Sequence, residues 1–127
     1  MPPTFDMLGH AFIALTLLLT VYGQLVLKWQ MGQVGALPPG ALEKLIFLLR
    51  QLLNPWILSG YVSALLASLA WMAAMTRFEL GYAYPFMSLA FVIVMGFGAL
   101  FLGESVGSAK ILGTLMVVAG LVLIARG

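Results

Sequence analysis

The sequence contains no cysteine, a single histidine and few charged residues, and each shortage excludes a class of function. Without cysteine, the chain can form no disulfide framework, thiol nucleophile or cysteine-ligated metal site. His10 alone cannot supply a histidine cluster for a metal. Charged residues make up 8% of the 127 residues, and a net charge of +2 is too small and too scattered to indicate nucleic-acid binding. We therefore expect no metal, no cofactor and no nucleic-acid partner.

Apolar residues are abundant instead. They make up 63% of the chain, and the mean hydropathy is +1.11. A water-soluble domain needs more polar surface than this composition provides. Long apolar runs separate the charges, which favours membrane helices over the alternation typical of a β-barrel. The sequence predicts an all-α membrane protein, a single domain over residues 1–127, with transmembrane helices at 7–29, 55–76, 81–102 and 108–125. The first run is too long for a signal-peptide core and is expected to be retained.

Residues 41–53 are too polar to form a further span. Leu42, Leu45 and Leu49 share a wide apolar face, which Glu43 and Arg50 oppose. This pattern predicts a short helix that lies in the membrane interface between the first two spans. An extension of the second span is the alternative, but the Asn-Pro pair at 54–55 favours a break.

The first span carries a polar stripe. Thr16, Thr20, Gln24 and Lys28 recur every four residues and share one helix face. They either line a polar cavity or satisfy packing needs: the threonines can bond back to their own helix, and Gln24 can join helices. Lys28 lies near the helix end and can extend to the interface.

The start of the third span has the most distinctive composition. Pro85 lacks an N–H, so it removes the helical partner of the Gly81 carbonyl if the helix already includes that residue. With Tyr82, Tyr84 and Ser88 nearby, this corner could bind a polar headgroup. Alternatively, the proline lies harmlessly in the first turn and the tyrosines belong to an interfacial aromatic belt.

Other residues allow two interpretations as well. Trp71 in the second span is either a cavity wall or an ordinary interior aromatic, and that span's small residues, such as Gly60 and Ser63, favour close helix packing. Gly113 and Gly120 lie seven residues apart, on nearly one face of the last span, and predict a dimer surface there.

Taken together, these segments resemble a known superfamily. Gly23-Gln24 with Lys28, residues 81–85, residues 102–104 and the two glycines of the last span match, in order, a single-unit member of the drug/metabolite transporter superfamily, over about residues 8–125. That superfamily includes the small multidrug resistance proteins. The chain is most similar to the small subunits that flip undecaprenyl-phosphate-aminoarabinose and to EamA-like lipid-carrier transporters, through residues 22–28 and 83–92. The resemblance implies a multi-pass protein of the bacterial cytoplasmic membrane.

One departure from the multidrug branch is informative. Those proteins carry an essential membrane glutamate three residues before the glycine that matches Gly23, and this chain has Thr20 there. Its carboxylates, Asp6, Glu43, Glu79 and Glu104, lie at the edges of the spans or in loops. Because a proton–drug exchanger needs a titratable group inside the membrane, the sequence argues against that mechanism.

We therefore expect a transporter or flippase of a polyprenyl-phosphate lipid or lipid-linked sugar, with Lys28 and Arg77 as the cations for a phosphate. One unit is too small to enclose a path, which predicts a homodimer or a heterodimer with a similar small subunit. The alternatives are an exporter of organic cations or metabolites, and a non-transporting scaffold subunit. The spans contain no nucleophile–base pair, so the sequence does not predict an enzyme. The predicted substrate-binding residues are Thr20, Gln24, Lys28, Trp71, Arg77, Tyr82, Tyr84, Pro85 and Ser88.

Overall fold

A computed structural model describes residues 6–127 of the chain, and these residues are helical apart from short connections. No strand occurs among them. The elements in chain order are α1 (Met7–Met31), α2 (Ala41–Arg50), η1 (Gln51–Leu53), α3 (Pro55–Met75), α4 (Leu80–Ala83), η2 (Tyr84–Ser88), α5 (Leu89–Phe101) and α6 (Ser108–Arg126). Four of the described segments are long and apolar enough to cross a membrane: Met7–Met31, Pro55–Met75, Leu80–Phe101 and Ser108–Arg126. The predicted all-α membrane fold is confirmed.

Side-chain caps explain where the first two spans begin. The Asp6 carboxylate accepts a hydrogen bond from the Gly9 N–H at the start of α1 (3.0 Å). At the start of α3, the Asn54 side chain accepts from the Trp56 N–H (2.9 Å), and Pro55 occupies the first turn. A proline costs nothing there because that turn has no internal partner for its N–H.

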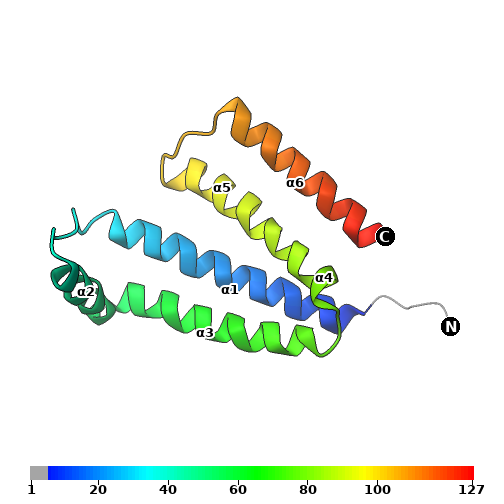
Figure 1. Ribbon diagram of the computed structural model, residues 1–127, viewed down its shortest axis with the longest axis horizontal. Coiled ribbons are helices and arrows are strands. Elements are labelled where there is room, and N and C mark those ends of the chain that lie inside the picture. The colour runs from blue at the N-terminus through cyan, green and yellow to red at the C-terminus, as the bar shows by residue number, and fades with distance from the viewer. Residues whose placement is uncertain (1–5) are drawn as a thin grey trace.

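The helices α1 and α3 run side by side along the length of the bundle (Figure 1). Glycines allow their close approach: a Cβ added to Gly23 would lie 3.1 Å from the Gly60 carbonyl oxygen. Ser63 adds a bond between the helices, because its hydroxyl donates to the Leu19 carbonyl oxygen (2.6 Å). Small residues on α3 therefore do form a packing surface, as the sequence predicts.

The third span is not one regular helix. It begins at Leu80 as α4, continues as the 3₁₀ segment η2 and becomes α5 at Leu89. Pro85 lies in the first turn of η2 but beyond the first turn of the span, which begins at Leu80, so the structure favours the interpretation in which the Gly81 carbonyl loses its helical partner. Since the proline has no N–H for the Gly81 carbonyl, the chain tightens into 3₁₀ geometry at this point.

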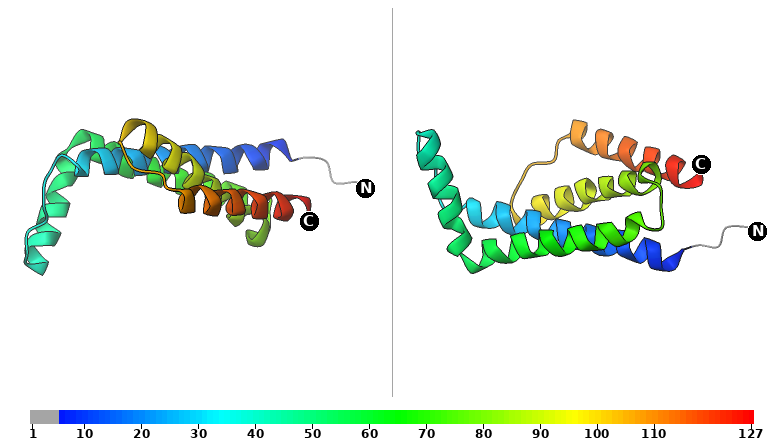
Figure 2. Two further views of the ribbon diagram at one scale, coloured as in Figure 1. Left: turned by 90° about the horizontal axis from the view of Figure 1, so that it is seen from above. Right: turned by 60° about the horizontal axis from the view of Figure 1, so that its bottom comes forward.

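The short helix between the first two spans is present as α2 and η1. It lies crosswise at one end of the bundle (Figures 1 and 2). No residue of α2 or η1, all of which the structure describes, is buried. The break before α3 is held in place by the Asn54 amide, which donates to the Gln30 side-chain oxygen at the end of α1 (2.9 Å). The apolar face of α2 is thus available to the membrane interface.

One cluster of buried hydrophobic residues lies between α1, α3 and α4, toward the end of the bundle where α1 begins and α6 ends (Figure 1). Its buried members are Ile13, Leu17, Ala74 and Ala83. In contrast, α6 buries only Thr114 and Leu121. Most of α6 is therefore free to face lipid or another subunit.

Candidate functional site

A groove of about 570 Å³ opens between α1, α3 and η2. This size lies within the ordinary range for small-molecule sites, about 300–1,000 Å³. Its wall combines apolar side chains with a smaller number of hydroxyl, amide and aromatic groups. The lining residues are Thr16, Thr20, Gly23, Gln24, Leu27, Gly60, Tyr61, Ala64, Ala67, Ser68, Trp71, Met72, Tyr84 and Met87.

The contribution of α1 follows from the four-residue spacing of its polar stripe. Thr16, Thr20 and Gln24 all line the groove. The Thr16 hydroxyl donates to the Phe12 carbonyl oxygen (2.8 Å), so this residue also bonds back to its own helix. Gln24 is exposed, and its amide is available to a ligand.

The opposite wall comes from α3. Tyr61, Ser68 and Trp71 share a face with small residues, which leave the space that the groove occupies. The Ser68 hydroxyl donates to the Ala64 carbonyl oxygen (3.1 Å). At the far side, the rings of Trp71 and Tyr84 meet edge to face, with centroids 6.0 Å apart. The 3₁₀ turn at Pro85 places Tyr84 in this contact.

Lys28 lies one turn beyond Gln24 and does not belong to the groove lining. Its Nζ is 3.6 Å from Oε2 of Glu104, in the connection between α5 and α6. That connection is held by the N–H groups of Leu102 and Glu104, both of which donate to the Gly98 carbonyl oxygen, while Gly103 adopts a positive φ of 69°. The side chains of Lys28 and Glu104 are 64% and 43% exposed, so this ion pair is weak.

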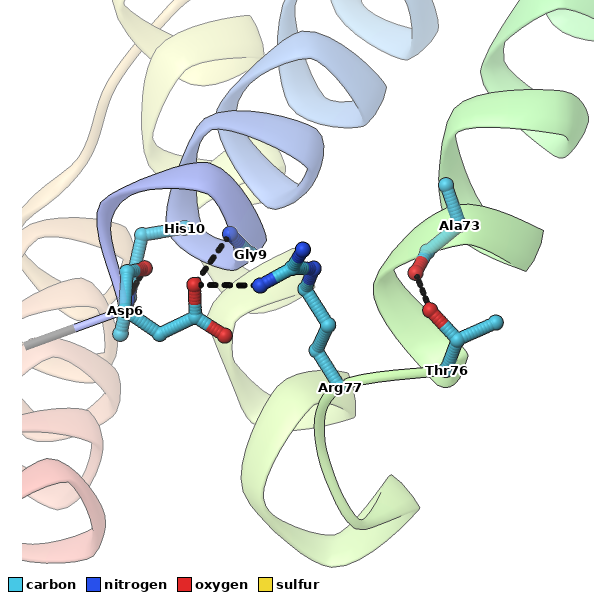
Figure 3. Close-up of polar contacts among 6 residues, drawn as sticks. All are labelled: Asp6, Gly9, His10, Ala73, Thr76 and Arg77. Atoms are coloured by element: carbon cyan, nitrogen blue, oxygen red, sulfur yellow. Dashed lines mark hydrogen bonds and ion pairs between the residues drawn. The ribbon is translucent and has the colours of Figure 1, made fainter. Parts of the chain in front are cut away.

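Arg77 lies at the opposite end of the bundle, where Figure 3 shows its contacts. Its Nη1 donates to Oδ1 of Asp6 (3.0 Å), the same oxygen that caps α1. The hydrogen bond from the Gly9 N–H, together with the Arg77 guanidinium, holds the pKa of Asp6 below its ordinary value. Asp6 and Lys28 are about 33 Å apart along α1 at ~1.5 Å per residue. Lys28 and Arg77 therefore cannot contact one phosphate together.

An aromatic cluster fills the same end. The rings of Phe78, Tyr82 and Phe86 surround His10, with centroids 4.8, 5.9 and 5.9 Å from it. His10 Nδ1 donates to the Asp6 carbonyl oxygen (2.7 Å), and its Nε2 forms a hydrogen bond with the Tyr82 hydroxyl (2.9 Å). Tyr82 thus links α4 to α1 by a hydrogen bond that lies outside the groove.

The structure divides the predicted substrate-binding residues into four groups. Thr20, Gln24, Trp71 and Tyr84 line one groove. Lys28 lies next to it, and Arg77 and Tyr82 lie at the opposite end. Pro85 and Ser88 belong to η2 but do not line the groove. Whether any of them contacts a substrate stays a prediction.

Sequence reasoning missed part of the wall. It assigned the small residues of the second span, which include Ala64 and Ser68, to helix packing and did not consider Tyr61, yet all three line the groove. A signal was present: 61, 64, 68 and 71 follow the spacing of one helix face, which combines polar, small and aromatic residues.

Four helical segments are long and apolar enough to cross a membrane, and three of them border a partly polar groove, which is typical of a small multi-pass membrane protein of the transporter class. The chain belongs to the EamA-like transporter family, whose model matches residues 2–126. With its bacterial relatives, this places the protein in the bacterial cytoplasmic membrane.

Curated relatives carry names that fit this class. A protein of Serratia proteamaculans, named a probable 4-amino-4-deoxy-L-arabinose-phosphoundecaprenol flippase subunit ArnF, is 29% identical over 93% of this chain and 92% of its own length. A probable subunit ArnE of the same flippase type, from Pseudomonas fluorescens, is 29% identical over 85% of this chain and 89% of its own length. A probable subunit ArnE from Pseudomonas aeruginosa is 34% identical over 60% of this chain and 66% of its own length. No solved structure matches the chain.

Proposed function

We propose that the protein is a subunit of a flippase that moves a lipid-linked sugar, carried on a polyprenyl phosphate, across the bacterial cytoplasmic membrane. The observation that carries the proposal is the groove: hydroxyl, amide and aromatic side chains gather on helices whose other faces are apolar. Transferring a sugar from water into hydrocarbon costs much free energy unless its hydroxyls find hydrogen-bond partners. The groove offers such partners while the lipid tail stays among the lipids.

The polar residues of the groove and the neighbouring Lys28 have different roles in this mechanism. Gln24, Thr20 and Tyr84 offer neutral hydrogen bonds to the headgroup, and Trp71 gives it an aromatic wall. Lys28 supplies the positive charge for the phosphate, because an ammonium acts as a compact point charge for such groups. Its exposed pairing with Glu104 is weak enough for a phosphate to replace.

The proposal includes a second subunit. The groove is bounded by α1, α3 and η2, and α6 contributes nothing to its lining. Apart from the neighbouring backbone of α6 itself, no described heavy atom lies within 4 Å of a Cβ built on Gly113 or Gly120, so this face of α6 is open for close helix packing. The relatives are likewise named as subunits. A homodimer and a heterodimer with a similar small chain both fit.

The test is a flipping assay in proteoliposomes. A polyprenyl-phosphate sugar with a radiolabelled sugar is placed in both leaflets, and membrane-impermeant periodate reports how much becomes accessible with time. We expect the chain, alone or with a co-purifying small subunit, to speed the exchange, and Gln24→Leu to slow it at least tenfold. Gln33→Leu is the matched control, because Gln33 is exposed in the connection after α1, outside the groove. The proposal fails if no lipid-linked sugar binds or moves.

An exporter of organic cations is less well supported. Among residues 6–127, those that line the groove include no carboxylate to accompany a cation. An unpaired charge in a membrane interior is costly. The groove therefore suits a headgroup whose inserted part is polar but uncharged.

A further inference from the structure

The polar groups of the groove share one property: all are neutral. Within the part of the chain that the structure describes, the lining has no Asp, Glu, Lys, Arg or His. Its polar members are three hydroxyl residues, one amide, two phenols and one indole, namely Thr16, Thr20, Ser68, Gln24, Tyr61, Tyr84 and Trp71. These groups hydrogen-bond to sugar hydroxyls without carrying a charge.

The carboxylates of the chain lie elsewhere. Asp6 is bound to Arg77 at one end of the bundle, and Glu104 is paired with Lys28. Glu43 lies in the first turn of α2, and Glu79 precedes α4. A second copy of this chain would add the same uncharged lining. An ammonium group in the groove would therefore have no counter-ion on its wall.

Aromatic rings are the other groups that attract an ammonium. Trp71, Tyr84 and Tyr61 offer such rings, and a cation over a ring face is attracted by its quadrupole. However, Trp71 and Tyr84 already make an edge-to-face contact with an interplanar angle of 79°. The attraction to a ring is also the smaller effect, because removing an ion from water without a charged partner costs more.

A neutral sugar ring carries no charge, so its entry into the groove does not include the free-energy cost of removing an ion from water. Its hydroxyls can bond to Gln24, Thr20 and Ser68, and its apolar face can contact the aromatic wall. Its phosphate link can reach Lys28, which lies one helical turn beyond Gln24 and keeps its charge outside the groove. The sugar and the phosphate thus find chemically different surroundings on neighbouring turns of α1.

We infer that the groove selects a polyprenyl-phosphate sugar whose ring carries no charge over the same lipid bearing a free amino sugar. This inference rests on the proposed function and narrows its substrate class. It separates this chain from its relatives, whose names specify an amino sugar. The residues that set the preference are the uncharged polar residues of the lining, which include Gln24, one helical turn before Lys28.

The experiment compares four short-chain lipids on the purified chain in nanodiscs at pH 7, by calorimetric titration. The probes are the bare polyprenyl phosphate, the lipid with a neutral hexose, the lipid with the corresponding amino sugar, and that amino sugar after N-acetylation. We expect the neutral sugar to bind at least tenfold more tightly than the amino sugar, and acetylation, which removes the charge, to restore most of the affinity.

A matched substitution tests the cause. Gln24→Glu keeps the side-chain size and places a carboxylate on the wall, so it should shift the preference toward the amino sugar by at least tenfold. The inference is overturned if the amino sugar binds wild type equally well or better, or if the bare phosphate binds as tightly as the neutral sugar. In either case the proposed function survives. If none of the four lipids binds, the proposed function fails, and the inference fails with it.

Discussion

Replacing Glu104 by glutamine should strengthen the binding of a polyprenyl phosphate. In the structure, the Glu104 carboxylate lies 3.6 Å from the Lys28 ammonium and competes with any phosphate for it. An exposed pair of this kind is worth about 0.2–1 kcal/mol. Removing the competitor should therefore raise the affinity by up to about fivefold, since ~1.4 kcal/mol corresponds to a factor of ten.

The assay is titration of bare polyprenyl phosphate into nanodiscs, at low and high salt. The increase for Glu104→Gln should shrink at high salt, because the screening length falls from about 30 Å at 0.01 M salt to about 3 Å at 1 M salt, which is shorter than the 3.6 Å between the two charges. Lys28→Met should weaken binding by about tenfold or more, since hydrogen bonds to charged groups contribute about 1.5–3 kcal/mol. Thermal stability serves as the control, and Glu104→Gln should change it little.

The double variant decides between competition and a general effect of charge. If Glu104 acts through Lys28, then Glu104→Gln should add nothing in a Lys28→Met background, and the cycle should show a coupling energy. An equal gain in both backgrounds would mean that the carboxylate repels phosphate from elsewhere. In that case Lys28 would not be the phosphate site and the reasoning would be refuted.

Three further changes test the packing, the N-terminal cap and the subunit interface. Gly23→Ala should cost about 1–3 kcal/mol in thermal or denaturant unfolding, because the new Cβ would lie 3.1 Å from the Gly60 carbonyl oxygen; Gly96→Ala, with open space in the described structure, is the control. The pKa of Asp6 is lowered from its ordinary value of 3.8. The ionised Asp6 carboxylate therefore contributes its full stabilisation above pH 3.8 and loses it as the pH falls through the folded-state pKa. The melting temperature of Asp6→Asn should therefore fall less than that of wild type below about pH 4, and equal falls would contradict this role. Gly113→Leu should leave the fold intact but reduce chemical cross-linking between subunits; unchanged cross-linking would remove α6 from the proposed interface.

Much of the fold could be predicted because a membrane imposes simple rules on sequence. Each span must be apolar and about twenty residues long, and the breaks must contain glycine, proline or charge. The predicted bounds of the spans differ from the structure by no more than two residues at any end, with α1 ending at Met31 and α6 at Arg126. The amphipathic pattern of residues 41–53 identified the short helix for the same reason.

The site was less predictable, because its composition depends on how helices pair. The four-residue stripe identified Thr20 and Gln24, but periodicity alone does not show which helix faces them. The partners came from α3, where Tyr61 and Ser68 belong to a face that small residues had marked for packing. Tyr82 and Tyr84 are two residues apart, so they point in different directions: one contacts His10 and the other contacts Trp71.

The positions of the charged residues relative to the groove determine which transport mechanism it can support. Where the multidrug branch of the superfamily has a membrane glutamate, this chain has Thr20, a hydroxyl residue of the groove wall. A hydroxyl can bond to a sugar but does not exchange protons near neutral pH. Lys28, Glu104, Asp6 and Arg77 instead pair near the two ends of α1, which is long enough to cross the ~30 Å hydrocarbon layer. In the proposed flippase the charged phosphate would meet fixed charges near the membrane surfaces, and the uncharged wall between them would carry the sugar. Among the residues that the structure describes, the groove wall contains no Asp, Glu, Lys, Arg or His, so in this proposal any coupling to a proton gradient would act through groups outside the wall.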